Sequence, residues 1–189
     1  MDTARKLVIF PVDQFYALVG NVTLPKDPYG ITLTDILNDR SALTHRQGDH
    51  EHRPGRIFLT DAELYALHDN TRRICTVMTE VFIPVQQVRA VVDVHPELYQ
   101  GSADKRRESQ ERVRRSRDLT FALHGHAVRG VAEALEVYRK SDQFVGLTGV
   151  AIDEEPATAA GLSLAEFLRH LGCPPPDFMA VNLRCIIHS

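Results

Sequence analysis

The segment with the clearest capacity for chemistry is histidine-rich and reads THRQGDHEH over residues 44–52. Imidazole nitrogens and carboxylate oxygens are the ligands that zinc and other divalent ions accept. Structural zinc sites usually combine two separated ligand pairs, whereas this is one polar segment bounded by Gly48 and Pro54. The pattern is therefore a weak metal signal, and we expect no resident cofactor. The candidate ligands are His45, His50 and His52.

A second charged segment, DKRRESQERVRRSRD, runs from Asp104 to Asp118. Opposite charges recur four residues apart in it, which is typical of a solvent-exposed helix. Basic residues also outnumber acidic ones, so the alternative is an arm that contacts the phosphates of RNA. The basic candidates are Lys105, Arg106, Arg107, Arg112, Arg114 and Arg115.

Other kinds of chemistry have no motif in this chain. It contains no G-x-S-x-G elbow, no Walker glycine loop and no G-x-G-x-x-G, so we expect no catalytic residues. The three cysteines form no C-x-x-C pair, the formal net charge is -3, and no apolar run is long enough for a membrane helix. These features predict a cytoplasmic protein without a membrane anchor.

Two parts of the chain resemble each other. DQFYALVGNV, from Asp13, matches DQFVGLTGVA, from Asp142, and GITLTDIL is followed in the later part by GLSLAEFL. Matched blocks in the same order indicate an internal repeat. A competing match aligns YALVGNV with FALHGHA at Phe121, but we prefer the ungapped one. The ungapped match, extended through the second pair of blocks, makes Phe15 equivalent to Phe144, Gly20 to Gly149, and Asp35 to Glu166.

Hydrophobic alternation predicts that the first copy consists mainly of strands. Thr32 and Asp35 form a capping box for a short helix, as Ser163 and Glu166 do in the second copy. Residues 119–128 fit a helix and a strand equally well. The predicted strands are Leu7–Phe10, Phe15–Leu24, Arg56–Leu67, Arg73–Val85 and Val88–Val94.

ITLTDILN at Ile31, FLTDA at Phe58 and FIPVQQVRAVV at Phe82 carry a family resemblance. They are similar to an uncharacterised bacterial Sm-like small β-barrel domain with an Arg-Leu-Ser-Asp-Leu-Leu-Asn-type signature, although Ile31 stands where that signature has arginine. The resemblance implies a five-stranded barrel and supplies no catalytic residues. It also brings RNA binding into consideration.

The expected fold is therefore mainly β (α+β), with two small SH3-like or Sm-like barrel units, short capping helices and a charged helical linker. The first unit is expected over 1–95, the linker over 96–134, and a shortened second unit over 135–189. An incomplete unit leaves a strand edge that another element or subunit must cover. The leading hypothesis is a non-catalytic assembly or protein-interaction module that forms homo-oligomers or binds a protein partner. RNA binding and a metal-dependent enzyme are the alternatives.

Overall fold

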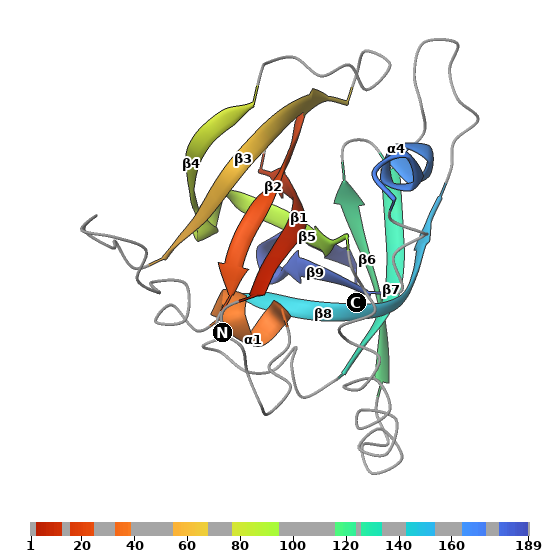
Figure 1. Cartoon of the computed structure of the whole chain (residues 1–189). Coiled ribbons are helices and arrows are strands. Elements are labelled where there is room, and N and C mark those ends of the chain that lie inside the picture. Colours follow the sequence, from red (N-terminus) through yellow and green to blue (C-terminus); the bar gives the residue numbers. More distant parts are fainter. Residues whose placement is uncertain are drawn as a thin grey trace.

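The chain folds as one antiparallel sheet of ten strands in the computed structural model (Figure 1). The structure describes residues 3–12, 16–24, 33–38, 55–67, 77–94, 116–123, 126–133, 143–153, 164–172 and 178–188. The strands in the first part of the chain are β1 (Thr3–Pro11), β2 (Tyr16–Leu24), β3 (Arg56–Ala66), β4 (Met78–Pro84) and β5 (Val88–Asp93). Those in the second part are β6 (Ser116–Leu123), β7 (His126–Glu133), β8 (Phe144–Ile152), β9 (Phe178–Asn182) and β10 (Ile186–His188). The short helices are α1 (Leu33–Asn38) and α4 (Leu164–His170), and one-turn 3-10 helices follow β4 (η2, Val85–Gln87) and β9 (η4, Leu183–Cys185).

The expectation of two separate barrels joined by a helical linker is wrong. The strand order β10-β6-β7-β8-β9-β5-β1-β2-β3-β4 is continuous and open, with β10 and β4 at its two ends. The part of the expected linker that the structure describes from Ser116 onward is the β6–β7 hairpin, in which Leu119 pairs with Gly130. A strand, rather than a helix, forms there because Leu119, Phe121 and Leu123 alternate onto one buried face.

The two halves of the sheet share one plan. In β1 to β5 the order is fifth, first, second, third, fourth strand, and in β6 to β10 it is the same. In each half a 3-10 turn joins the fourth strand to the fifth, and the first residue of that turn donates its N–H to the residue just before the third strand. Val85 does so to Gly55 and Leu183 to Gln143, both at 2.8 Å.

A bulge between the second and third strands also recurs. The pairing register shifts around Gly20 in β2 and around Gly130 in β7. A Cβ on Gly20 would lie 3.1 Å from the Leu59 Cβ, and one on Gly130 would lie 3.0 Å from the Leu147 Cβ. These distances are shorter than ordinary carbon contacts, so both positions need glycine for close strand approach.

The third strand bends in the same way in both halves, because a residue of positive φ follows a Leu-Thr pair. Asp61 has φ 49° in β3 and Gly149 has φ 59° in β8. The threonine just before each of these residues donates a hydrogen bond from its hydroxyl group to the second strand of its half. Thr60 Oγ1 donates to the Asn21 carbonyl at 3.5 Å and Thr148 Oγ1 donates to the Val131 carbonyl at 3.2 Å.

These correspondences overturn the residue equivalences expected from the DQF match. Gly20 corresponds to Gly130, and Gly149 corresponds to Asp61. Phe144 begins a third strand, β8, whereas the DQF match equates it with Phe15, next to the second strand, β2; Phe15 itself lies outside the described residues. Asp35 and Glu166 belong to helices at different places, since α1 follows the second strand of its half and α4 follows the third.

Gly130→Ala tests the bulge. We expect it to lower the free energy of unfolding by about 1–3 kcal/mol, because the added methyl group overpacks against Leu147. Gly149→Asp is the control. It should lower the free energy of unfolding by less than Gly130→Ala does, because Asp61 adopts the same positive φ at the corresponding place in the first half. Urea denaturation of both variants measures the difference, and a neutral Gly130→Ala would contradict the close approach.

The halves share their hydrophobic cores instead of having one each. The interior of the second half contains Leu119, Phe121 and the buried α4 residues, and it is completed by the outward faces of β1, β2 and β5. Val8 and Phe10 supply the β1 part of that face, while Leu7 and Ile9 point into the interior of the first half. Both faces of β1 are therefore buried, and neither half encloses its core without the other.

Two asparagines, one buried and one partly buried, form hydrogen bonds that connect the two halves of the sheet. Asn38, at the end of α1, donates its Nδ2 to the Phe144 carbonyl at 2.8 Å, and its Oδ1 accepts the N–H groups of Gln143 and Phe144 at 2.9 and 2.8 Å. Asn182, at the end of β9, donates to the Val88 carbonyl of β5 at 2.9 Å and accepts from the Arg184 N–H. Figure 1 shows β8 passing beside α1 and below the first-half strands.

Candidate interaction surface

Most of the predicted site residues do not come together. The metal candidates His45, His50 and His52 and the basic candidates from Lys105 to Arg115 lie outside the described residues. Within the described part of the chain, no group of three or more His, Cys, Asp or Glu side chains is placed to hold a metal ion. No helix in that part is long and apolar enough to cross a membrane. The Phe121 side chain is completely buried, so it cannot stack on RNA bases.

The outer edge of β4 is the first component of the site that the structure does present. β4 pairs with β3, and no described strand lies on its other side. Pro84 stands opposite Arg56, and Val85 donates to the Gly55 carbonyl. Since alternate residues of an antiparallel strand bond to the same neighbour, Ile83 and Val81 bond to β3. The backbone N–H and C=O groups of Glu80 and Phe82 therefore point to the free side.

An aromatic pair, of which Phe82 is exposed and Phe58 partly buried, lies on the face beside this edge. The Phe58 and Phe82 rings, on adjacent strands, have centroids 4.8 Å apart and planes tilted by 40°. Phe82 is 52% exposed, the largest exposure among the large hydrophobic residues that the structure describes as exposed. Aromatic pairs across strands usually stabilise a buried surface. An aromatic ring that is half exposed next to an open strand edge is typical of a contact surface.

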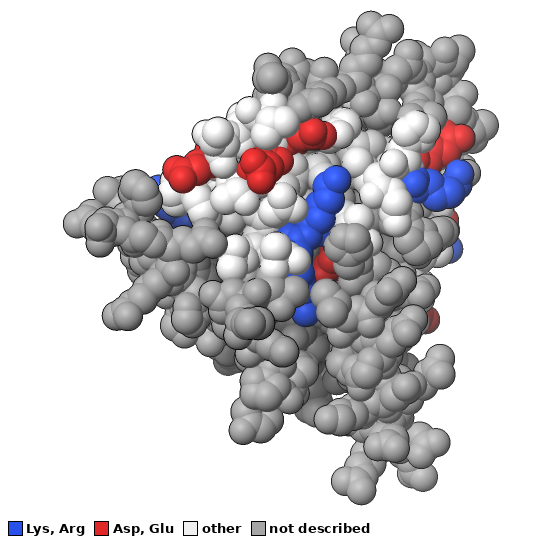
Figure 2. Space-filling view, in the orientation of Figure 1, with Lys and Arg blue, Asp and Glu red and all other residues white. Residues whose placement is uncertain are grey.

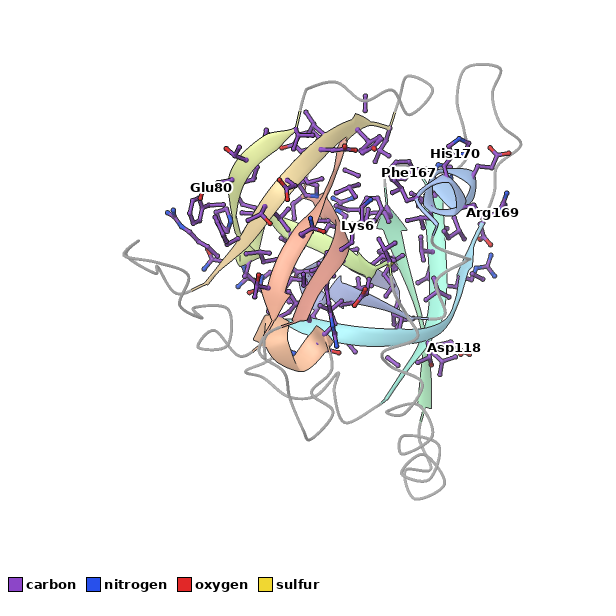
Figure 3. The ribbon with its side chains drawn as sticks, in the orientation of Figure 1. Lys6, Glu80, Asp118, Phe167, Arg169 and His170 are labelled. Atoms are coloured by element: carbon purple, nitrogen blue, oxygen red, sulfur yellow. The ribbon has the colours of Figure 1, made fainter. Side chains whose placement is uncertain are left out.

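Acidic side chains lie on the same two strands as this aromatic pair. Asp61 on β3 and Glu80 on β4 are exposed, and Glu63 is partly buried with its Oε2 accepting from the Tyr65 hydroxyl at 2.5 Å. Figure 2 shows acidic groups gathered over β3 and β4, and Figure 3 places Glu80 on the outer side of β4. Edge strands commonly carry charges that discourage unselective pairing.

The helix α4 forms a different part of the surface. Its Phe167 points toward the sheet, while Arg169 and His170 point away from it (Figure 3). Phe167 packs against Tyr65 of β3, with ring centroids 5.5 Å apart. This contact ties α4 to the first half of the sheet, so α4 serves the junction, and β4 remains the candidate surface.

Phe82 is absent from the predicted site residues, although the sequence carries a signal for it. In MTEVFIP the residues Glu80, Phe82 and Pro84 share one face by alternation, and an aromatic residue next to a charged one on a strand face is more typical of a contact site than of a core. That β4 is an edge strand could not be read from the sequence, because its position depends on long-range pairing. Comparison with models of protein families, with curated proteins and with solved structures finds no match for this chain.

Proposed function

We propose that the chain is a non-catalytic assembly module that binds further copies of itself through the β4 edge and the Phe58–Phe82 pair. The observation that carries the proposal is the half-exposed Phe82 on a strand whose outward backbone groups have no described neighbour. An added strand would bond to those groups and cover the aromatic pair, which is the physics of β-strand addition.

Substituting Phe82 tests this function. Wild-type protein should show a mass that rises with concentration in size-exclusion chromatography with light scattering. Phe82→Lys should remain at the monomer mass, because it puts a charge on the edge and removes the apolar contact. Phe82 is exposed, so the variant should keep the wild-type stability to within about 0.5 kcal/mol.

His170→Lys is the control. His170 is also exposed, but it lies on α4 and its side chain points away from the sheet (Figure 3). We expect this variant to assemble like the wild type. Wild-type protein that stays at monomer mass at the highest soluble concentration would contradict the proposed function.

A further inference from the structure

The internal junction of the sheet shows which strands of this fold pair with each other between units. β5 is the fifth strand of the first half, and it pairs with β9, the fourth strand of the second half, through Ala90 with Val181 and Val91 with Ala180. The strands at the two ends of the sheet are β4, the fourth strand of the first half, and β10, the fifth strand of the second half. Each molecule therefore presents one edge of each kind used at its own internal junction.

From this arrangement we propose that copies of the chain associate head to tail, with β10 of one molecule adding antiparallel to β4 of the next. The inference rests on the assembly function proposed above and specifies its partner and its direction. Such a contact joins two different surfaces of the same chain. It therefore produces a closed ring or an open fibre, and not a two-fold dimer.

The position of Phe82 supports this pairing. In the two halves Ile57 pairs with Ile83 and Val145 pairs with Val181, so Phe82 corresponds to Ala180. Ala180 is the residue of β9 that pairs with Val91 across the internal junction, and it is fully buried there. The exposed aromatic ring thus occupies the position at which the internal junction is made.

The backbone of β10 offers the matching edge. In β5, Val94 donates to the Lys6 carbonyl, so by alternation Val92 and Ala90 bond to β1, and Val91 directs its backbone groups toward β9. β10 follows its 3-10 turn as β5 does, so Ile187 corresponds to Arg89. Ile187 lies between the residues that pair with β6, Ile186 and His188, and no described strand lies on the other side of β10.

The contact between molecules is weaker than the junction within the molecule. Outward residues of β1 and β2 at the internal junction, such as Val8 and Val19, are apolar and buried. The corresponding outward faces of β6 and β7 carry Asp118, which is exposed, Thr120, which is partly buried, and Arg129, which is exposed. Backbone pairing and the phenylalanines therefore provide most of the contact, and the assembly should dissociate on dilution.

Mixing two blocked variants tests the direction of assembly. Phe82→Pro removes an outward N–H from β4, and Ile187→Pro removes an N–H from β10 at the place where its pairing with β6 is irregular. If a proline variant loses its circular dichroism spectrum, Phe82→Lys or Ile187→Glu replaces it, since an edge charge blocks pairing without altering the backbone. Native mass spectrometry with one variant isotopically labelled distinguishes homodimers from heterodimers.

In the head-to-tail arrangement each variant alone is monomeric, with self-association weakened at least about tenfold, and the equimolar mixture forms a heterodimer and nothing larger. An Ile187→Pro variant that still dimerises with itself would show β4 pairing with β4. That result would overturn the head-to-tail inference while leaving the assembly function intact. Wild-type protein that never exceeds the monomer mass would overturn the assembly function, and the inference with it.

Discussion

Replacing Phe10 with alanine should destabilise both halves of the sheet together by about 3–5 kcal/mol. Phe10 is fully buried on the outward face of β1 and packs into the interior of the second half with Leu119 and Phe121. Removing the ring leaves a cavity in a core that neither half can close alone. Since both faces of β1 are buried, the cavity should destabilise the whole sheet in one cooperative step.

Urea denaturation followed by circular dichroism and hydrogen exchange measures this effect. Backbone amides of β7, which are distant in sequence from Phe10, should lose protection together with those of β2. Phe82→Ala is the control, because the Phe82 ring is half exposed. Its removal should lower the free energy of unfolding by less than about 1 kcal/mol. Two separate transitions in Phe10→Ala, with β7 protected through the first, would contradict a shared core.

The strands of the first half could be predicted from alternation alone. The expected strands at Leu7–Phe10, Phe15–Leu24, Arg56–Leu67, Arg73–Val85 and Val88–Val94 overlap β1 to β5. Their buried residues alternate with exposed ones or form short apolar runs, and both patterns are local properties of the chain. The helices at Leu33 and Leu164 were also expected from their capping residues.

The arrangement of the second half was not predictable in the same way, because the same residue type has a different structural role in each half. Gly20 is needed where two strands approach closely, whereas Gly149 is needed for a positive φ. A sequence match equates these glycines, although Gly20 lies at a close approach of two strands and Gly149 lies at a bend with positive φ. The true counterpart of Gly149 is Asp61, which tolerates the left-handed conformation through its short polar side chain.

The helical interpretation is wrong for Ser116–Asp118, the part of the charged segment that the structure describes, and the reason is related. Alternating charges before Asp118 favour a helix locally, but pairing partners decide the conformation of the residues that follow. Leu119, Phe121 and Leu123 lie opposite Gly130, Val128 and His126 in a regular hairpin. A pattern compatible with both helix and strand is resolved by tertiary contacts, which a single sequence does not display.

The candidate surface depends on the same long-range information. Nothing near Phe82 in sequence indicates that β4 ends the sheet, while β9, which has the same place in its half, is covered by β5. The sequence difference between the two places is a phenylalanine against an alanine. Ala180 is fully buried in the close packing of the internal junction, whereas Phe82 is 52% exposed. The two positions therefore differ in burial although they share a backbone arrangement.

Replacing Asn38 with alanine should lower the free energy of unfolding by about 2–4 kcal/mol, because one side chain serves three backbone groups at the start of β8. The Phe144 carbonyl loses its donor, and the Gln143 and Phe144 N–H groups lose their acceptor. These groups are partly buried, so water replaces the bonds only in part. Thermal and urea denaturation provide the measurement.

Asn38→Asp separates the two roles of this side chain. An aspartate keeps an acceptor for the two N–H groups but cannot donate to the Phe144 carbonyl, so its cost should fall between those of the wild type and the alanine variant. Hydrogen exchange should locate the loss at β8 and at the β5–β9 pairing beside it. If Asn38→Ala is as stable as the wild type, or loses protection only within α1, the junction is held by its apolar packing alone and the asparagine fastens nothing.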